Sequence, residues 1–189
     1  MTPPRRPRLF LDVDGVLNAF DFDPSRDIAG FADFDVHEIE FEPNSHFTDA
    51  FIVVLSPTMG ARLAGLGADI SWATTWEHRA DSAIAERCGL PRGLPVLTRP
   101  CDATDHWAGW KFDAVRRSVE SDSRPFVWLD DDIDRFAAGS LTARAWAAEL
   151  SMPSLLIAPD PRSGLLPEHI DEIEEFLACC VDLAPDRTQ

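Results

Sequence analysis

Short apolar runs and amphipathic stretches alternate along the chain, and together they predict a series of strands and helices. Apolar runs are typical of buried strands, and they occupy residues 9–11, 51–55, 68–76, 125–129 and 154–158. Apolar residues three or four positions apart predict helices over 57–67, 77–87, 108–120, 141–150 and from 167 onward. Residues 31–41 alternate partly at period two and predict a strand that pairs with 51–55, and residues 94–97 predict a short further strand.

Strands that alternate with helices predict an α/β fold. The expected architecture is a three-layer, Rossmann-like domain with a parallel sheet in the middle and helices on both faces. The 189 residues, of which 45% are apolar, suit a single domain over residues 1–189. Residues 15–55 predict a small cap insertion with a hairpin after the first strand. Residues 1–7 are basic and rich in proline, and they predict a flexible leader and not a signal peptide.

Composition narrows the classes of partner. The net charge of −16 opposes binding to nucleic acid through a broad basic surface, although a small basic pocket stays compatible with it. No apolar run approaches the roughly 20 residues needed to cross a bilayer, so no membrane partner is expected. The four cysteines show no CxxC spacing, which favours a reducing cytoplasm. None of these features predicts an oligomeric state.

The first candidate for chemistry is a pair of carboxylates, Asp12 and Asp14, which follow the apolar run 9–11. Ligands of open α/β sheets bind outside the carboxyl ends of the strands. Alternating side chains place Asp12 and Asp14 on the same side of an extended segment. Two carboxylates this close repel each other unless a cation or a shared proton lies between them. The pair therefore predicts a divalent metal ion, a proton-transfer role, or both.

Further polar residues are expected at the same edge of the sheet. They follow later strands or begin a helix, and they are Thr74, Thr75, Lys111, Asp130 and Asp131. Each has an ordinary role when taken alone, such as a helix cap, a surface turn or a solvated lysine. Taken together they supply carboxylates, a hydroxyl and an ammonium group, the set that phosphoryl transfer through an aspartate nucleophile requires.

These segments, in this order, resemble the four motifs of the haloacid dehalogenase-like (HAD) superfamily. The first motif is Asp12-Val13-Asp14-Gly15-Val16, the second ends at Thr74 or Thr75, the third is Lys111 and the fourth is Asp130-Asp131. Within the superfamily, the sequence around these motifs is most similar to the HAD domain of "Swiss Army Knife" RNA-repair proteins. The segments that carry this closer resemblance are residues 11–18, 72–77 and 128–131.

The resemblance and the chemistry of carboxylates imply a role for each residue. Asp12 would be the nucleophile and Asp14 the general acid and base. Mg²⁺ would bind Asp12, Asp130, the backbone carbonyl of Asp14, and Asp131 directly or through water. Thr74, with Thr75 as the alternative, would bind a phosphoryl oxygen. Lys111 would balance the charge that develops in the transition state.

The expected activity is Mg²⁺-dependent hydrolysis of a phosphomonoester. Phosphatases of the superfamily carry the second aspartate, here Asp14, whereas its dehalogenases lack it, so Asp14 argues against cleavage of a carbon–halogen bond. A phosphotransferase and a non-catalytic phosphate- or partner-binding module remain alternatives. The subfamily name implies nucleotides or nucleic-acid ends as substrates, and a small cap would leave room for a large or polymeric phosphoester. A small phosphometabolite remains an alternative substrate if a partner subunit covers the site.

Overall fold

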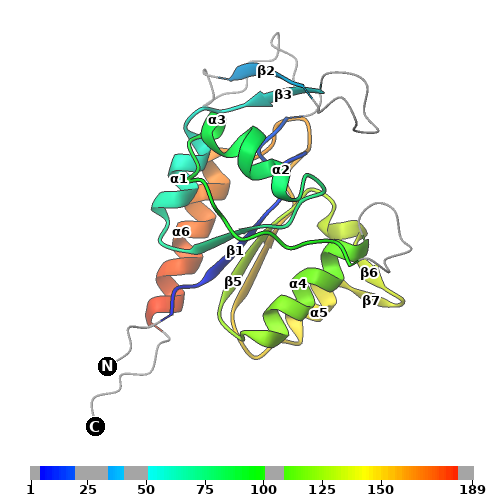
Figure 1. Ribbon diagram of the computed structural model, residues 1–189. Coiled ribbons are helices and arrows are strands. Elements are labelled where there is room, and N and C mark those ends of the chain that lie inside the picture. The colour runs from blue at the N-terminus through cyan, green and yellow to red at the C-terminus, as the bar shows by residue number, and fades with distance from the viewer. Residues whose placement is uncertain (1–4, 20–33, 41–50, 101–108, 183–189) are drawn as a thin grey trace.

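A four-stranded parallel sheet forms the centre of the molecule. The computed structural model describes residues 5–19, 34–40, 51–100 and 109–182. The sheet has the order β4-β1-β5-β8, and its strands are β1 (Arg8–Leu11), β4 (Asp69–Trp72), β5 (Phe126–Leu129) and β8 (Ser154–Ile157) (Figure 1). Because β1 lies between β4 and β5, the chain crosses from one side of β1 to the other. The carboxyl end of β1 is therefore at the point where the strand order reverses, the usual ligand position in such sheets.

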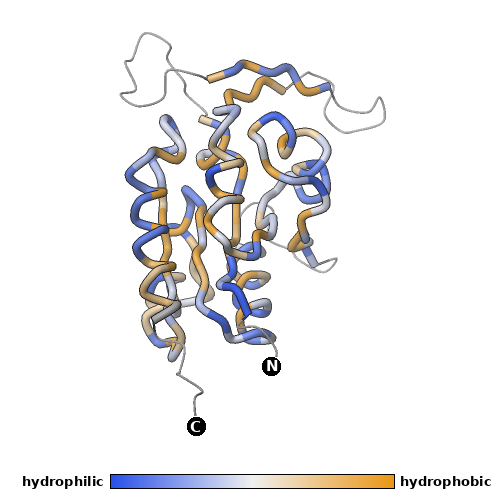
Figure 2. The backbone as a smooth tube through the Cα atoms, turned by 90° about the vertical axis from the view of Figure 1, so that its left-hand side faces the viewer, coloured by the Kyte–Doolittle hydropathy of each residue, from blue (hydrophilic) through white to orange (hydrophobic). Residues whose placement is uncertain are grey.

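Helices cover both faces of the sheet, as the sequence predicts. One face carries α1 (Met59–Gly65), α6 (Pro167–Asp182) and a helical stretch made of α2 (His78–Ala80), a π-helical turn (Asp81–Ala85) and α3 (Glu86–Cys88). The other face carries α4 (Gly109–Ser121) and α5 (Ala143–Ala148). Strand side chains alternate between these layers: Leu9 and Leu11 pack on the first face, and Phe10 packs on the second. Figure 2 shows the resulting apolar centre.

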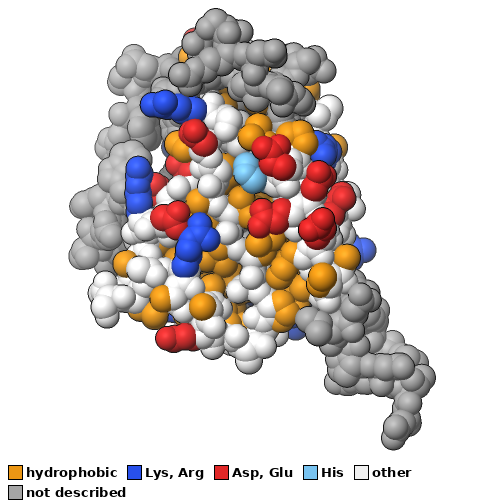
Figure 3. All heavy atoms as spheres, turned by 180° about the vertical axis from the view of Figure 1, so that it is seen from behind, with side chains coloured by type: hydrophobic (Ala, Val, Ile, Leu, Met, Phe, Trp, Pro, Cys, Tyr) orange, Lys and Arg blue, Asp and Glu red, His pale blue; other side chains and the backbone are white. Residues whose placement is uncertain are grey.

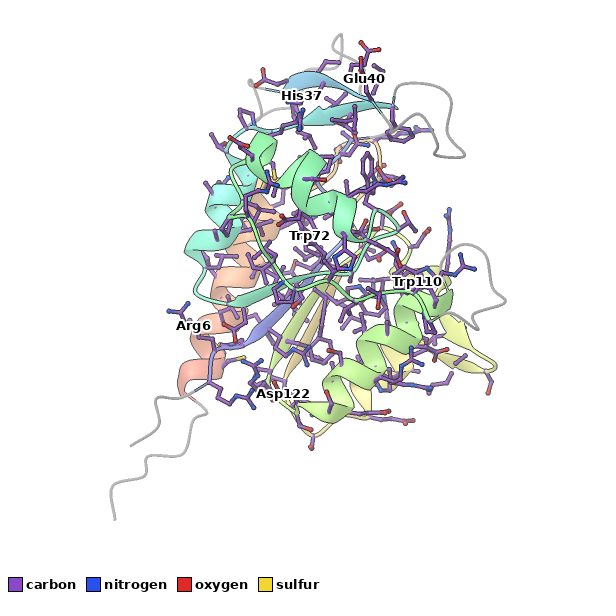
Figure 4. All side chains as sticks on the ribbon, in the orientation of Figure 1. Arg6, His37, Glu40, Trp72, Trp110 and Asp122 are labelled. Atoms are coloured by element: carbon purple, nitrogen blue, oxygen red, sulfur yellow. The ribbon has the colours of Figure 1, made fainter. Side chains whose placement is uncertain are left out.

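An antiparallel hairpin follows β1 in the chain, as predicted. It consists of β2 (Asp35–Ile39) and β3 (Phe51–Leu55), and it packs on the core through Ile39, Val53 and Leu55. In Figure 4 the hairpin residues His37 and Glu40 lie at the opposite end of the molecule from Arg6 and Asp122. The hairpin therefore stands over one end of the sheet. Of the expected cap segment 15–55, residues 20–33 and 41–50 lie outside the described residues.

Two predicted elements differ from the structure. Residues 94–97 form no strand, and only Val96 makes an isolated bridge to Trp72. The predicted helix over 141–150 begins later, because Leu141–Thr142 form strand β7, which pairs with β6 (Ala137–Ala138). Thr142 has an extended backbone, and its hydroxyl accepts a hydrogen bond from the Ala145 N–H (3.2 Å), so the helix starts after this cap.

The described surface is acidic on the side away from the viewer in Figure 1, where many Asp and Glu side chains gather (Figure 3). This agrees with the net charge of −16. Within the described ranges, no helix has both the length and the apolar character needed to cross a membrane. Of the expected leader 1–7, residues 1–4 lie outside the described part, and Arg5 forms an ion pair with Asp122 at 2.8 Å.

Candidate active site

The site is built around Asp12, the first residue after β1. The apolar strand before it is fully buried, and backbone hydrogen bonds hold its end between β4 and β5: the Asp12 N–H donates to the Leu129 carbonyl (3.0 Å), and the Ala73 N–H donates to the Leu11 carbonyl (2.9 Å). The Asp12 side chain is only 3% exposed. One of its oxygens, Oδ1, accepts a hydrogen bond from the Val13 N–H at 2.8 Å. The sheet thus presents a buried carboxylate at the carboxyl end of its central strand.

Two further carboxylates join Asp12. Asp12, Asp130 and Asp131 each offer one oxygen, and these three oxygens lie within 4.8 Å of one another. Asp130 directly follows β5 and is 0% exposed, and its Oδ1 accepts a hydrogen bond from the Asp132 N–H at 3.1 Å. An all-oxygen group of this kind suits a hard divalent cation such as Mg²⁺. We refer to Asp12, Asp130 and Asp131 as the acidic cluster.

Gly15 gives Asp131 room to approach the loop after β1. Its φ is +70°, and a Cβ added there would lie 2.3 Å from the Asp131 Cγ, far inside van der Waals contact. A residue with a side chain would therefore suffer both an unfavourable backbone conformation and a collision with the acidic cluster. The glycine of the first motif is thus explained by the carboxylate of the fourth.

Lys111, in the first turn of α4, is the cation of the site. Its ammonium nitrogen lies 2.5 Å from Asp12 Oδ2 and 3.1 Å from Asp130 Oδ2, and its side chain is nearly fully buried. A compact ammonium can contact two converging carboxylates more closely than a planar guanidinium can. Lys111 is also the only lysine among the 17 basic residues of the sequence, and all the others are arginine.

The acidic cluster carries more negative charge than Lys111 can balance. Burial and the neighbouring Asp12 raise the pKa of Asp130 well above its ordinary value. Burial, together with Asp132 and Asp12, raises the pKa of Asp131 to about 6. Burial alone would lower the pKa of Lys111, but the charges of Asp12 and Asp130 raise it. These opposing shifts show where positive charge is needed, so the residues fit a bound divalent cation.

Asp14 points its carboxylate at other partners. Its Oδ2 accepts a hydrogen bond from the Trp76 indole Nε1 (2.8 Å), and its Oδ1 accepts one from the Asn18 amide Nδ2 (2.9 Å). Its carboxylate is not among the clustered oxygens of the described residues, and metal binding through its backbone carbonyl remains a prediction. Burial raises the pKa of Asp14, although both hydrogen bonds lower it. The roles of Asn18 and Trp76 as donors were not predicted.

The two candidate threonines differ in their surroundings. Thr74 is fully buried after β4, and its hydroxyl oxygen accepts a hydrogen bond from the Trp76 N–H at 3.3 Å. Thr75 is exposed. Thr74 directly follows Ala73, which is bonded to the end of β1, so Thr74 lies at the same edge of the sheet as Asp12. Thr74 is therefore the buried member of the pair, and its contact with a phosphoryl oxygen remains a prediction.

Comparison with known proteins agrees with this geometry. Residues 8–170 match the family described as the HAD domain in Swiss Army Knife RNA repair proteins. The chain belongs to this family. The match covers every residue of the acidic cluster, together with Lys111. No curated protein and no solved structure matches the chain. In this HAD domain the acidic cluster is consistent with a HAD active site and could hold a metal ion.

Proposed function

We propose that this HAD domain is a Mg²⁺-dependent phosphomonoester hydrolase that works through an aspartyl-phosphate on Asp12. The observation that carries the proposal is the buried acidic cluster, in which Asp12 lies 2.5 Å from the Lys111 ammonium at the carboxyl end of the central strand. A carboxylate oxygen held at a fixed position beside an ammonium group can act as a nucleophile toward phosphorus. The family match supports the same assignment.

The proposed reaction has two steps. In the first, an Asp12 carboxylate oxygen forms a bond to phosphorus, the ester P–O bond breaks, and Asp14 gives its proton to the leaving oxygen. In the second, water attacks the aspartyl-phosphate while Asp14 takes the proton from that water, which releases phosphate and restores Asp12. Lys111 and the Thr74 hydroxyl would stabilise charge on the phosphoryl oxygens.

Mg²⁺ would be held by the acidic cluster and by the backbone carbonyl of Asp14. When bound, it supplies the positive charge that allows a phosphate dianion to approach several carboxylates. The charge imbalance of the cluster supports this part of the proposal, since burial and like charges raise the pKa of both Asp130 and Asp131.

The proposed substrate class is a phosphorylated nucleic-acid end. The family description names RNA repair proteins, and this is the main support for that class. The hairpin β2–β3 is small, and a small cap would leave the site open to the end of a long strand. With a net charge of −16, a substrate held mainly at its terminal phosphate is more compatible with this chain than one held along a broad basic surface.

The test is phosphate release across a substrate panel, with and without Mg²⁺. The panel contains an aryl phosphate, mononucleotides, sugar phosphates and oligonucleotides phosphorylated at the 5′ or the 3′ end. We expect Asp12→Asn or EDTA to abolish turnover. Asp113→Asn is the matched control, because its side chain is 44% exposed, pairs with Arg116 and lies outside the acidic cluster.

Three results would contradict parts of the proposal. Full activity of Asp12→Asn would rule out the covalent mechanism, and activity on mononucleotides alone would rule out nucleic-acid ends. Transfer of the phosphoryl group to an added alcohol, seen as a new phosphoester, would identify a phosphotransferase. A failure of the wild-type protein to release phosphate from any substrate would favour a non-catalytic binding module.

A further inference from the structure

The two donors that hold Asp14 leave its carboxylate little freedom. The Trp76 indole Nε1 donates a hydrogen bond to one oxygen (2.8 Å), and the Asn18 amide Nδ2 donates one to the other oxygen (2.9 Å). Hydrogen bonds to both oxygens restrict rotation of the carboxylate about its last torsion angle. A general acid needs this restriction, because it must present its proton at hydrogen-bond distance from the leaving oxygen.

Both donors are also attached to strand β3 of the hairpin. The Asn18 side-chain oxygen accepts a buried hydrogen bond from the Val54 N–H at 2.8 Å. The ring of Phe51 meets the ring of Trp76 edge-on, with 5.4 Å between the ring centroids and 79° between the planes. Each group that holds Asp14 is therefore itself held by a residue of β3, by a hydrogen bond in one case and by an aromatic contact in the other.

We infer that Asn18 and Trp76 are positioning residues that orient Asp14 for proton transfer and make this orientation depend on the hairpin. The inference rests on the proposed function, in which Asp14 is the general acid and base. A displacement of β3 would disturb the Asn18 amide and the Trp76 ring together, and both are bonded to the same carboxylate. The hairpin thus acts on the chemistry as well as on access to the site.

Trp76→Phe is the first test, because it deletes the indole N–H and keeps an aromatic ring beside Phe51. We measure kcat/KM for two substrates, because this parameter covers the steps up to departure of the leaving group. An alkyl phosphate has a leaving group that needs a proton, whereas p-nitrophenyl phosphate does not. We expect kcat/KM to fall at least about tenfold for the alkyl phosphate and less than about threefold for the aryl phosphate.

Two comparisons separate positioning from a merely structural effect. Trp146→Phe is the matched control, because Trp146 is as buried as Trp76 (6% and 8% exposed) but packs against Phe112 and Phe126 on the other face of the sheet. We expect it to change both substrates equally. In an Asp14→Asn background, Trp76→Phe should cause no further selective loss, because a positioning residue acts through the group it positions.

The link to the hairpin has its own test. Phe51→Leu removes the ring edge that holds Trp76 and keeps an apolar side chain, and we expect a selective loss of about two- to tenfold for the alkyl phosphate. Ile52→Ala is the control, because Ile52 is the next residue of β3 and is 55% exposed. We expect this control to change neither substrate. Urea unfolding checks that each variant is folded.

The outcomes distinguish this inference from the proposed function. Equal losses for both substrates in Trp76→Phe, or an unchanged selective loss in the Asp14→Asn background, would overturn the positioning role. A selective loss in Trp76→Phe without one in Phe51→Leu would overturn the dependence on the hairpin. A wild-type protein that releases phosphate from neither of these substrates nor from any oligonucleotide of the panel would instead contradict the proposed function itself.

Discussion

Replacing Lys111 by methionine tests whether the site is held together by its one ammonium group. Methionine keeps most of the length and apolar character of the lysine stem, so the change removes mainly the charge. In the native protein this ammonium contacts Asp12 at 2.5 Å and Asp130 at 3.1 Å. All three side chains are at most 5% exposed, so water screens the interaction little.

The expected cost follows from what the variant leaves behind. Breaking a buried ion pair by removing one partner typically destabilises a protein by about 3–5 kcal/mol, because an uncompensated charge stays buried. For a domain of this size, that corresponds to a fall in Tm of about 6–20 °C. The cost should shrink at low pH, because the pKa of Asp130 is already raised and a protonated carboxyl group no longer needs the ammonium.

The assay is urea unfolding in EDTA and in Mg²⁺, at pH 5 and at pH 7.5. We expect the largest difference between Lys111→Met and wild type at pH 7.5 in EDTA. Mg²⁺ should narrow this difference, because the ion brings positive charge to the same carboxylates. Turnover should stay low even in Mg²⁺, with a loss of about a hundredfold or more, because in the proposed reaction the ion does not replace the ammonium that would stabilise the phosphoryl oxygens.

Arg116→Met is the matched control on the same helix. Arg116 is 31% exposed and pairs with Asp113 and Glu120 on the surface, so its removal should cost less than about 1 kcal/mol. The reasoning would be refuted if Lys111→Met in EDTA at pH 7.5 were as stable as this control. It would also be refuted if Mg²⁺ left the difference between variant and wild type unchanged.

Three further predictions test other parts of the site. Gly15→Ala should destabilise the protein by at least about 1 kcal/mol more than Gly67→Ala and should weaken Mg²⁺ binding, as measured by urea unfolding and Mg²⁺ titration. Both glycines have a positive φ, but only at Gly15 would an added Cβ collide with Asp131. In thermal scans, the rise in Tm caused by Mg²⁺ should be smaller at pH 5 than at pH 7.5. The pKa of Asp131 is raised to about 6, so at pH 5 protons compete with the ion for this carboxylate. Thr74→Val should lower kcat/KM about ten- to a hundredfold, whereas Thr75→Val should leave it nearly unchanged.

The fold and the cluster could be predicted because their determinants are local or follow from topology. An apolar run such as 125–129 predicts a buried strand, and parallel strands end at one edge of the sheet. Residues that directly follow such strands must therefore gather there, as Asp12 and Asp130 do. The N-terminus of α4, the helix that precedes β5, returns to the same edge, which brings in Lys111.

The rest depended on contacts that no local pattern encodes. The indole of Trp76 reaches Asp14 across 62 positions of the chain, and the amide of Asn18 bonds to a strand 36 positions away. Residues 94–97 were expected to form a strand because they are apolar, but only one bridge to Trp72 forms there. Such details depend on how the elements pack against one another, and apolar periodicity does not report that packing.

The contrast between Asp12 and Asp14 is the strongest physical argument for their different proposed roles. The carboxylate of Asp12 lies in contact with the Lys111 ammonium, which holds one of its oxygens in place. A general acid must hold a proton, and the two side chains that donate hydrogen bonds to Asp14, those of Asn18 and Trp76, are neutral, while burial raises the pKa of Asp14. When two neighbouring carboxyl groups have different surroundings, one site can contain both a general acid and a nucleophile. Here the difference comes from outside the motif, because α4 supplies the charged partner of Asp12, and the segment after β4, together with Asn18, supplies the neutral partners of Asp14.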